Sequence, residues 1–191
     1  MLSRMDTIKK SNFDIALAWI FHAEGGDSDD ADDPGGTTRY GISLRYLKTK
    51  GVLGDIDGDG DIDDDDIRAL TKEDAAKLYQ LDFWYKSQCD QLPFPLALIL
   101  FDQAVNTGVI TSVRILQEYV GAYVDGIIGK NTIAKATAKF NSNPKWFIAS
   151  YMARRARYYT SVTSNKPKLI KYLNGWFTRL FDLQLFIVEN I

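Results

Sequence analysis

Cysteine, histidine and long apolar runs are scarce in this sequence of 191 residues. The one cysteine, Cys89, cannot close a disulfide within the chain, so the sequence indicates no particular redox compartment. The apolar run from Phe94 to Phe101 ends at Asp102, far short of the roughly 20 apolar residues that a membrane span needs. The basic N-terminal stretch is not followed by the apolar core and small-residue cleavage site of a signal peptide. We therefore expect neither a membrane span nor a signal peptide.

Apolar residues recur at helical spacing along most of the chain, which predicts a mainly α fold. The expected helices cover residues 12–24, 44–50, 71–86, 95–106, 111–121, 131–140, 144–160 and 168–189. A small β element is expected near residues 37–43, where β-branched and aromatic residues follow a glycine-rich loop. Composition changes near the turn at 91–93, so we expect lobes at 1–92 and 93–191 that form one compact unit.

Charges of opposite sign are separated along the chain. Residues 27–33 contain five acids and residues 55–66 contain eight, with no lysine or arginine in either stretch. From Lys130 to Arg179 the balance is reversed, with eleven bases and no acid. A basic region of this size favours an anionic polymer, which could be nucleic acid, a membrane surface or the bacterial envelope. No nucleic-acid-binding motif accompanies it, so we expect attraction to anionic envelope polymers.

Glu24 is the candidate catalytic acid. It lies three residues after Phe21 and seven after Leu17, so its carboxyl group emerges from the apolar stripe of its own helix. It also lies near the C-terminal end of that helix, where the helix dipole disfavours a negative charge. Both conditions help a carboxyl group to keep the proton that a general acid donates. The alternative from these residues alone is a solvent-exposed glutamate at a frayed helix end, and His22 should face away from Glu24.

Several motifs occur in one order along the chain. They are H-A-E-G-G at 22–26, D-P-G-G-T-T-R-Y-G-I-S at 33–43, F-D-Q-A-V-N-T-G at 101–108, V-D-G-I-I-G-K-N-T at 124–132 and N-G-W-F-T-R at 174–179. On these motifs the sequence resembles glycoside hydrolase family 108, a family of N-acetylmuramidases common among phage endolysins. The resemblance spans about residues 12–182 and implies a lysozyme-like α+β fold. The segment at 116–129 further resembles a turn found in peptidoglycan-binding modules.

The resemblance also implies the site residues. It assigns catalytic roles to Glu24, Asp33 and Thr38 and substrate-binding roles to Tyr40, Asp102 and Asn106. Glycosidases usually use two carboxylates, one protonating the leaving oxygen and the other activating water or stabilising the transition state. Asp33 is the expected second carboxylate, with Thr38 orienting the water. The neighbouring Asp32 is the alternative to Asp33.

Residues 55–66 read D-I-D-G-D-G-D-I-D-D-D-D, which has the spacing of an EF-hand calcium loop. The expected ligands are Asp55, Asp57, Asp59, Asp61, Asp63 and Asp66, with Asp61 binding through its backbone carbonyl. Eight carboxylates in twelve residues would repel one another unless a cation were present, although a solvated acidic loop is the alternative. The segment also resembles one dockerin repeat, but dockerins use two. We therefore expect a structural calcium ion.

These interpretations together predict a monomeric peptidoglycan hydrolase that cleaves the β-1,4 bond between N-acetylmuramic acid and N-acetylglucosamine. A lytic transglycosylase acting on the same bond is one alternative. A non-catalytic, calcium-dependent protein that binds the cell wall or assists secretion is another. The expected partner is bacterial peptidoglycan rather than nucleic acid. Without a signal peptide, the protein is expected to stay in the host bacterial cytoplasm until a phage holin releases it to the wall.

Overall fold

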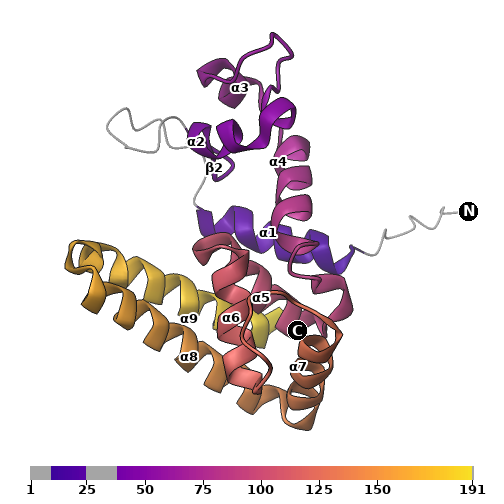
Figure 1. Cartoon of the computed structure of the whole chain (residues 1–191), viewed down its shortest axis with the longest axis vertical. Coiled ribbons are helices and arrows are strands. Elements are labelled where there is room, and N and C mark those ends of the chain that lie inside the picture. Colours follow the sequence, from indigo (N-terminus) through magenta and orange to yellow (C-terminus); the bar gives the residue numbers. More distant parts are fainter. Residues whose placement is uncertain (1–9, 25–37, 191) are drawn as a thin grey trace, which may run out of the picture. The chain divides into compact units, whose positions relative to one another are not determined.

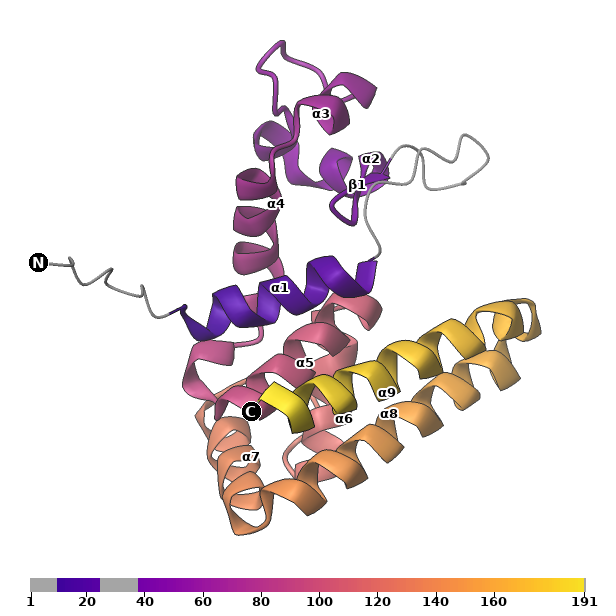
Figure 2. The ribbon, with the colours of Figure 1, turned by 180° about the vertical axis from the view of Figure 1, so that it is seen from behind.

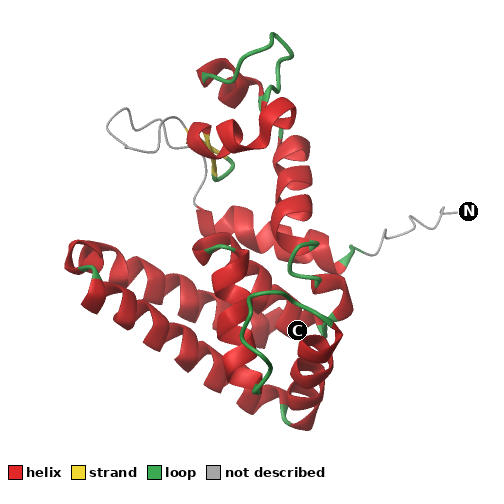
Figure 3. Cartoon of the chain, viewed as in Figure 1, coloured by secondary structure: helices red, strands yellow, loops and turns green. Residues whose placement is uncertain are grey.

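The computed structural model describes residues 10–24 and 38–190. Helices make up most of these residues, and two short strands form the small β element (Figures 1 and 3). The predicted mainly α, lysozyme-like fold with a small β element near residues 37–43 is confirmed. The chain divides into two compact units, Met1–Gln80 and Leu81–Ile191. Within the described residues, no helix combines the length and the apolar character that crossing a membrane requires.

Where the structure describes it, the first unit contains five helical segments and one hairpin. They are α1 (Asn12–Glu24), β1 (Thr38–Arg39), β2 (Ile42–Ser43), α2 (Leu44–Leu47), the 3-10 helix η1 (Lys48–Gly54), α3 (Asp64–Ala69) and α4 (Lys72–Tyr79). A capping box starts α1, because the Asp14 backbone N–H donates to Ser11 Oγ at 3.1 Å and the Ser11 N–H donates to Asp14 Oδ2 at 2.9 Å. Thr71 and Asp74 form the same arrangement at the start of α4. Both helix starts are where the sequence predicts them.

Strands β1 and β2 form an antiparallel hairpin with a two-residue turn. Thr38 pairs with Ser43 and Arg39 pairs with Ile42, which leaves Tyr40 and Gly41 in the turn. Both turn residues have positive φ, 52° for Tyr40 and 75° for Gly41. This combination defines a type I′ turn, whose twist matches that of the flanking strands.

Helix α3 was not among the helices expected from the sequence. It begins inside the acidic stretch, where Asp63 caps the helix and Asp66 Oδ2 accepts a hydrogen bond from the Asp63 backbone N–H. The Asp63 Oδ1 atom accepts the Asp65 backbone N–H at 2.7 Å. Acidic side chains favour the N-terminal turn of a helix because they complement its dipole. Two residues that the sequence predicts to be cation ligands, Asp63 and Asp66, therefore also form the start of a helix.

The second unit is a bundle of helices around α5. Its elements are η3 (Cys89–Gln91), α5 (Phe94–Thr107), α6 (Val109–Val120), α7 (Lys130–Ser142), α8 (Pro144–Asn165), the 3-10 helix η4 (Pro167–Tyr172) and α9 (Leu173–Asn190). A π-helical segment, η2 (Gln80–Trp84), follows α4 at the boundary of the units. Every residue from Leu96 to Ala104 is buried, so α5 is covered on all sides and forms the centre of this unit.

Helices α8 and α9 run side by side in both views of the ribbon (Figures 1 and 2). Leu180, Leu183 and Ile187 on α9 are buried, as residues of one helical stripe. The helix expected at 168–189 differs at its start, where residues 167–172 form a 3-10 helix. Pro167 has no backbone N–H to continue α8, so the first helix ends before it and a tighter turn leads into α9.

Candidate active site

Glu24 is the last residue of α1, and its half-buried side chain lies against the hairpin turn. The space around Gly41 shows how close this contact between Glu24 and the turn is. A β-carbon placed on Gly41 would lie 2.9 Å from Glu24 Cγ and 3.2 Å from Glu24 Cβ. These distances are shorter than carbon atoms in contact allow, so only a glycine lets the turn approach the glutamate this closely. The hairpin thus fixes the aliphatic part of the Glu24 side chain.

Tyr79 holds the same turn from α4. Its hydroxyl donates a hydrogen bond to the Tyr40 backbone oxygen at 3.2 Å, and a β-carbon on Gly41 would lie 2.5 Å from this hydroxyl. The ring of Phe21, one helical turn before Glu24, lies 6.0 Å from the Tyr40 ring and 6.0 Å from the Tyr79 ring. Three aromatic rings from α1, the hairpin and α4 therefore surround the turn that contacts Glu24.

Tyr40 has a backbone conformation that is rare for its residue type. A φ of 52° lies in the left-handed region, which Asn, Asp and Gly adopt far more readily than an aromatic residue. Such backbone strain persists only where surrounding contacts impose it, and it clusters at functional sites. Here the Tyr79 hydrogen bond and the Phe21 ring contact impose it. The predicted substrate-binding residue Tyr40 is thus placed beside Glu24 by its own turn.

Thr38 is half-buried on β1, two residues before the turn, and is paired with Ser43. Thr38 and Tyr40 therefore belong to the same hairpin, whose turn contacts Glu24 at the end of α1. Asp33 and its alternative Asp32 lie outside the described residues. His22 is exposed, and its ring lies 5.9 Å from that of Trp19.

Sequence reasoning missed the residues that position the hairpin. Arg39 donates to the backbone oxygen of Arg68 on α3, and its guanidinium lies 5.3 Å from the centre of the Tyr40 ring. This contact connects the hairpin to the helix that closes the acidic loop. Tyr79 lies 39 residues after Tyr40, so no local pattern indicates their hydrogen bond. The Tyr-Gly pair in a two-residue turn is the one signal that could have identified this geometry.

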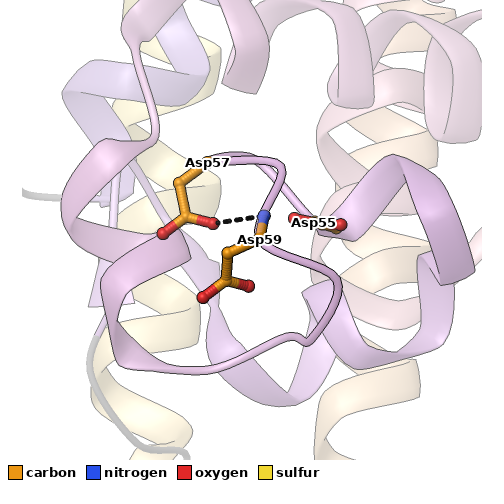
Figure 4. A group of neighbouring side chains, drawn as sticks. All are labelled: Asp55, Asp57 and Asp59. Carbon is orange, nitrogen blue, oxygen red and sulfur yellow. Dashed lines mark hydrogen bonds between the residues drawn. The ribbon is translucent and has the colours of Figure 1, made fainter.

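The acidic loop turns its carboxylates inward in two groups. One carboxylate oxygen from each of Asp55, Asp57 and Asp59 lies within 4.8 Å of the others, and Asp61, Asp63 and Asp66 form a second such group. Figure 4 shows the first group, with the Asp59 backbone N–H donating to Asp57 Oδ1 at 3.2 Å. Asp55 accepts the backbone N–H groups of Gly58 at 2.8 Å and Gly60 at 3.1 Å, which folds the loop around this carboxylate. All six predicted ligands thus line one loop.

Electrostatic repulsion is visible within this loop. Neighbouring Asp59 and Asp63 carboxylates, followed by burial, raise the pKa of Asp61. For Asp57, burial is the larger cause and nearby carboxylates add to it, so its pKa is also raised. At Asp66 burial opposes ionisation, but hydrogen bonds from the Asp63, Ile56 and Asp57 amides outweigh it and lower the pKa. The donor set consists of carboxylate oxygens, which is the chemistry that a calcium ion requires.

Asp102 and Asn106, the other two predicted substrate-binding residues, lie on α5 in the second unit. Asp102 is fully buried, and its carboxylate forms ion pairs with Arg155 at 2.6 Å and Arg179 at 2.8 Å. Asn106 Oδ1 accepts a hydrogen bond from the Tyr159 hydroxyl at 3.0 Å. In this structure Asp102 holds α8 and α9 against α5, and it presents no surface to a ligand.

The motif at 124–129 has a structural role in the second unit. The Gln117 side chain donates to Asp125 Oδ1 at 2.8 Å and to the Ile127 backbone oxygen at 3.0 Å. Its own oxygen accepts the Gly126 backbone N–H at 2.9 Å. One buried glutamine on α6 therefore fixes the loop between α6 and α7.

Comparisons with known proteins also divide the chain into two parts, but the change comes after residue 108 and not at the boundary between the two units. Residues 17–108 match the family described as Glycosyl hydrolase 108, and residues 111–181 match the family described as Predicted Peptidoglycan domain. Among solved structures, SagA of Brucella abortus is similar with a TM-score of 0.72 and 29% sequence identity, over 90% of this chain and 90% of that one. No functionally curated protein matches the sequence.

Proposed function

We propose that this glycoside hydrolase, which acts on peptidoglycan, is an N-acetylmuramidase. The bond cleaved would be the β-1,4 linkage between N-acetylmuramic acid and N-acetylglucosamine. The observation that carries this proposal is the contact between Glu24 at the end of α1 and the strained turn at Tyr40 and Gly41. A carboxyl group held in one position by a rigid turn is what proton donation to a glycosidic oxygen needs.

Glu24 would act as the general acid. Its aliphatic stem is confined by Gly41, so the carboxyl group has few orientations available and can be aimed at the leaving oxygen. Asp33 would be the second carboxylate, either activating water or stabilising the oxocarbenium-like transition state. Thr38, carried by the same hairpin, would orient the attacking water. Tyr40 would contact a sugar ring, since its side chain belongs to the turn beside Glu24.

A calcium ion bound by residues 55–66 would act as a structural cofactor. The grouped carboxylates and the raised pKa of Asp61 support a bound cation, because a cation removes the repulsion from Asp59 and Asp63 that is the main cause of this raised pKa. Its position would brace α3, which connects to the hairpin through the Arg39 hydrogen bond. The ion would therefore stabilise the wall of the site without taking part in the chemical step.

The products of digestion test the bond and the reaction. Purified peptidoglycan would be digested with the protein, and the released fragments analysed by mass spectrometry before and after borohydride reduction. A muramidase gives reducing N-acetylmuramic acid ends, and we expect these. Anhydro-muramic ends would instead show a lytic transglycosylase, and reducing N-acetylglucosamine ends would show cleavage of the other glycosidic bond. Either of these results would contradict the proposal.

A further inference from the structure

A groove of about 610 Å³ lies between α6 and α8 within the second unit. None of the predicted site residues lines it. Arg114 and Glu118 line it from α6, and Arg154, Arg157 and Tyr158 line it from α8. Three guanidinium groups face one carboxylate, so the groove carries a surplus of positive charge.

The arginines of the groove differ in how they are paired. Arg154 forms an ion pair with Glu118, which leaves that guanidinium partly neutralised. Arg114 and Arg157 are exposed and form no ion pair among the residues that the structure describes. Guanidinium groups present several N–H donors in a planar fork that matches the geometry of a carboxylate. Hydrogen bonds from the Ile127 amide and Gln117, and then the nearby Arg114, lower the pKa of Asp125, so the charge of Arg114 is partly offset. Arg157 is therefore the arginine of the three that is most available to an anionic ligand.

The rest of the groove adds one neutral donor and an apolar surface. The Tyr158 hydroxyl is protonated at neutral pH, as in any tyrosine, and can donate a hydrogen bond. Ile115 lies buried at the floor. This combination suits a ligand that carries both carboxylates and small apolar groups.

The loop motif at 124–129 positions one of the arginines. A β-carbon on Gly126 would lie 3.2 Å from Arg114 Nε and 2.8 Å from Ile110 Cγ2, so the Arg114 side chain lies flat against this glycine. Gln117 in turn fixes Gly126 by accepting its backbone N–H. The buried glutamine and the glycine together hold Arg114 at one end of the groove.

We propose that this groove binds the acidic peptide stem of peptidoglycan through the carboxylates of the stem. The choice of peptidoglycan as the polymer rests on the proposed function. The expectation that the ligand carries carboxylates rests on the residues that line the groove. A neutral glycan strand offers no negative charge to the three arginines of the groove. A stem peptide of alanine, glutamate and diaminopimelate offers free carboxylates and methyl groups at short spacing. It would tether the enzyme to uncleaved wall.

Calorimetry with a soluble probe tests the groove directly. The probe is the tetrapeptide L-Ala-γ-D-Glu-meso-diaminopimelate-D-Ala, titrated into the full chain. We expect binding by the wild type, and we expect Arg114→Gln combined with Arg157→Gln to weaken it about tenfold or more, because two charge-assisted contacts are lost. Gly126→Ala should also weaken binding, because its methyl group displaces Arg114. Lys130→Gln combined with Lys168→Gln removes the same charge from exposed positions outside the groove and should leave the affinity unchanged.

Three outcomes would overturn the proposal. The first is equal weakening by the arginine pair and the lysine pair, which would mean diffuse attraction. The second is unchanged binding of a probe whose carboxylates are amidated. The third is binding of poly(glycerol phosphate) without binding of the tetrapeptide, which would assign the groove to a phosphate polymer. None of these readouts depends on bond cleavage, so an enzyme that failed to release reducing muramic ends would disprove the muramidase and leave this test standing.

Discussion

Glu24 and Gly41 are in such close contact that a β-carbon on the glycine would lie 2.9 Å from the glutamate Cγ. Helix α1 and the hairpin each contribute one side of this contact, so the orientation of the carboxyl group depends on the backbone of the turn. Phe21, Tyr40 and Tyr79 keep that backbone in place. The hairpin is thus a positioning device for the acid, and its variants should change catalysis more than they change stability.

Gly41→Ala should lower the rate of wall digestion by about 100-fold, because a displacement of the acid by about 1 Å can cost that much. It should also destabilise the protein by about 1–3 kcal/mol, since alanine at positive φ is strained and its methyl meets Tyr79 and Glu24. Turbidity assays and thermal unfolding measure the two effects. Gly121→Ala is the matched control, because Gly121 has φ of 69° with no atom within 4 Å of an added β-carbon. Equal activity loss in both variants would mean that general destabilisation, and not the Glu24 contact, limits catalysis.

Tyr79→Phe should keep the ring contacts and remove the hydrogen bond to the Tyr40 oxygen. We expect a stability loss of about 1 kcal/mol, typical of one hydrogen bond, and a clear fall in kcat with little change in KM. We expect kcat to fall because the turn loses the restraint that holds Tyr40 at positive φ. Steady-state kinetics on a soluble muramyl oligosaccharide would measure kcat and KM. A variant with unchanged kcat would remove Tyr79 from the positioning role.

Asp61→Asn should raise the melting temperature in chelator at neutral pH. The carboxylates around Asp61 raise its pKa, so in the metal-free protein its charge is repelled and removing that charge stabilises the fold. This repulsion is present above the raised pKa and disappears as the pH falls below the unfolded value, about 3.9. The advantage of Asp61→Asn over the wild type should therefore shrink toward pH 4. If the difference in melting temperature between Asp61→Asn and the wild type grew as the pH fell, the predicted direction would be wrong.

Calcium should raise the melting temperature of the wild type by about 5–10 °C at one hundred times its dissociation constant, since a ligand bound only to the folded loop stabilises it by about 2.7 kcal/mol. Asp57→Asn should abolish most of this response, because its carboxylate is one of the proposed ligands. Asp61→Asn should keep it, because position 7 of such a loop binds through the backbone carbonyl. Asp64→Asn, outside the six ligand positions, is the control. An identical melting temperature with calcium and with chelator, in protein shown to be metal-free, would reject the site.

Local patterns in the sequence predicted the parts of the fold that depend on local interactions. The capping pairs Ser11 with Asp14 and Thr71 with Asp74 act within one helical turn, so their spacing is readable. The positive φ of Tyr40 had one local signal, the Tyr-Gly pair, but it is contacts from α1 and α4 that hold this conformation in place. For the same reason, the motif containing Asp102 favoured a ligand contact, whereas its partners Arg155 and Arg179 lie 53 and 77 residues later. Pairings at such separations leave no local periodicity.

The acidic loop shows how one pattern can serve two purposes. Its spacing predicted a set of inward carboxylates, and the structure gathers all six side chains around one loop. The same pattern concealed helix α3, because Asp63 and Asp66 act as a capping pair as well as candidate ligands. The calcium ion itself stays a prediction.

The rate of wall digestion by Glu24→Gln tests the central claim most directly. The amide keeps the shape of the side chain against Gly41 but cannot donate a proton, so activity should fall by about 100-fold or more while the melting temperature is retained. Glu73→Gln, at an exposed position of α4, is the control and should remain active. The measurement is turbidity loss of purified walls at matched protein concentration. If Glu24→Gln retains more than about a tenth of the wild-type rate, the loss is too small for a general acid and Glu24 is not the catalytic acid.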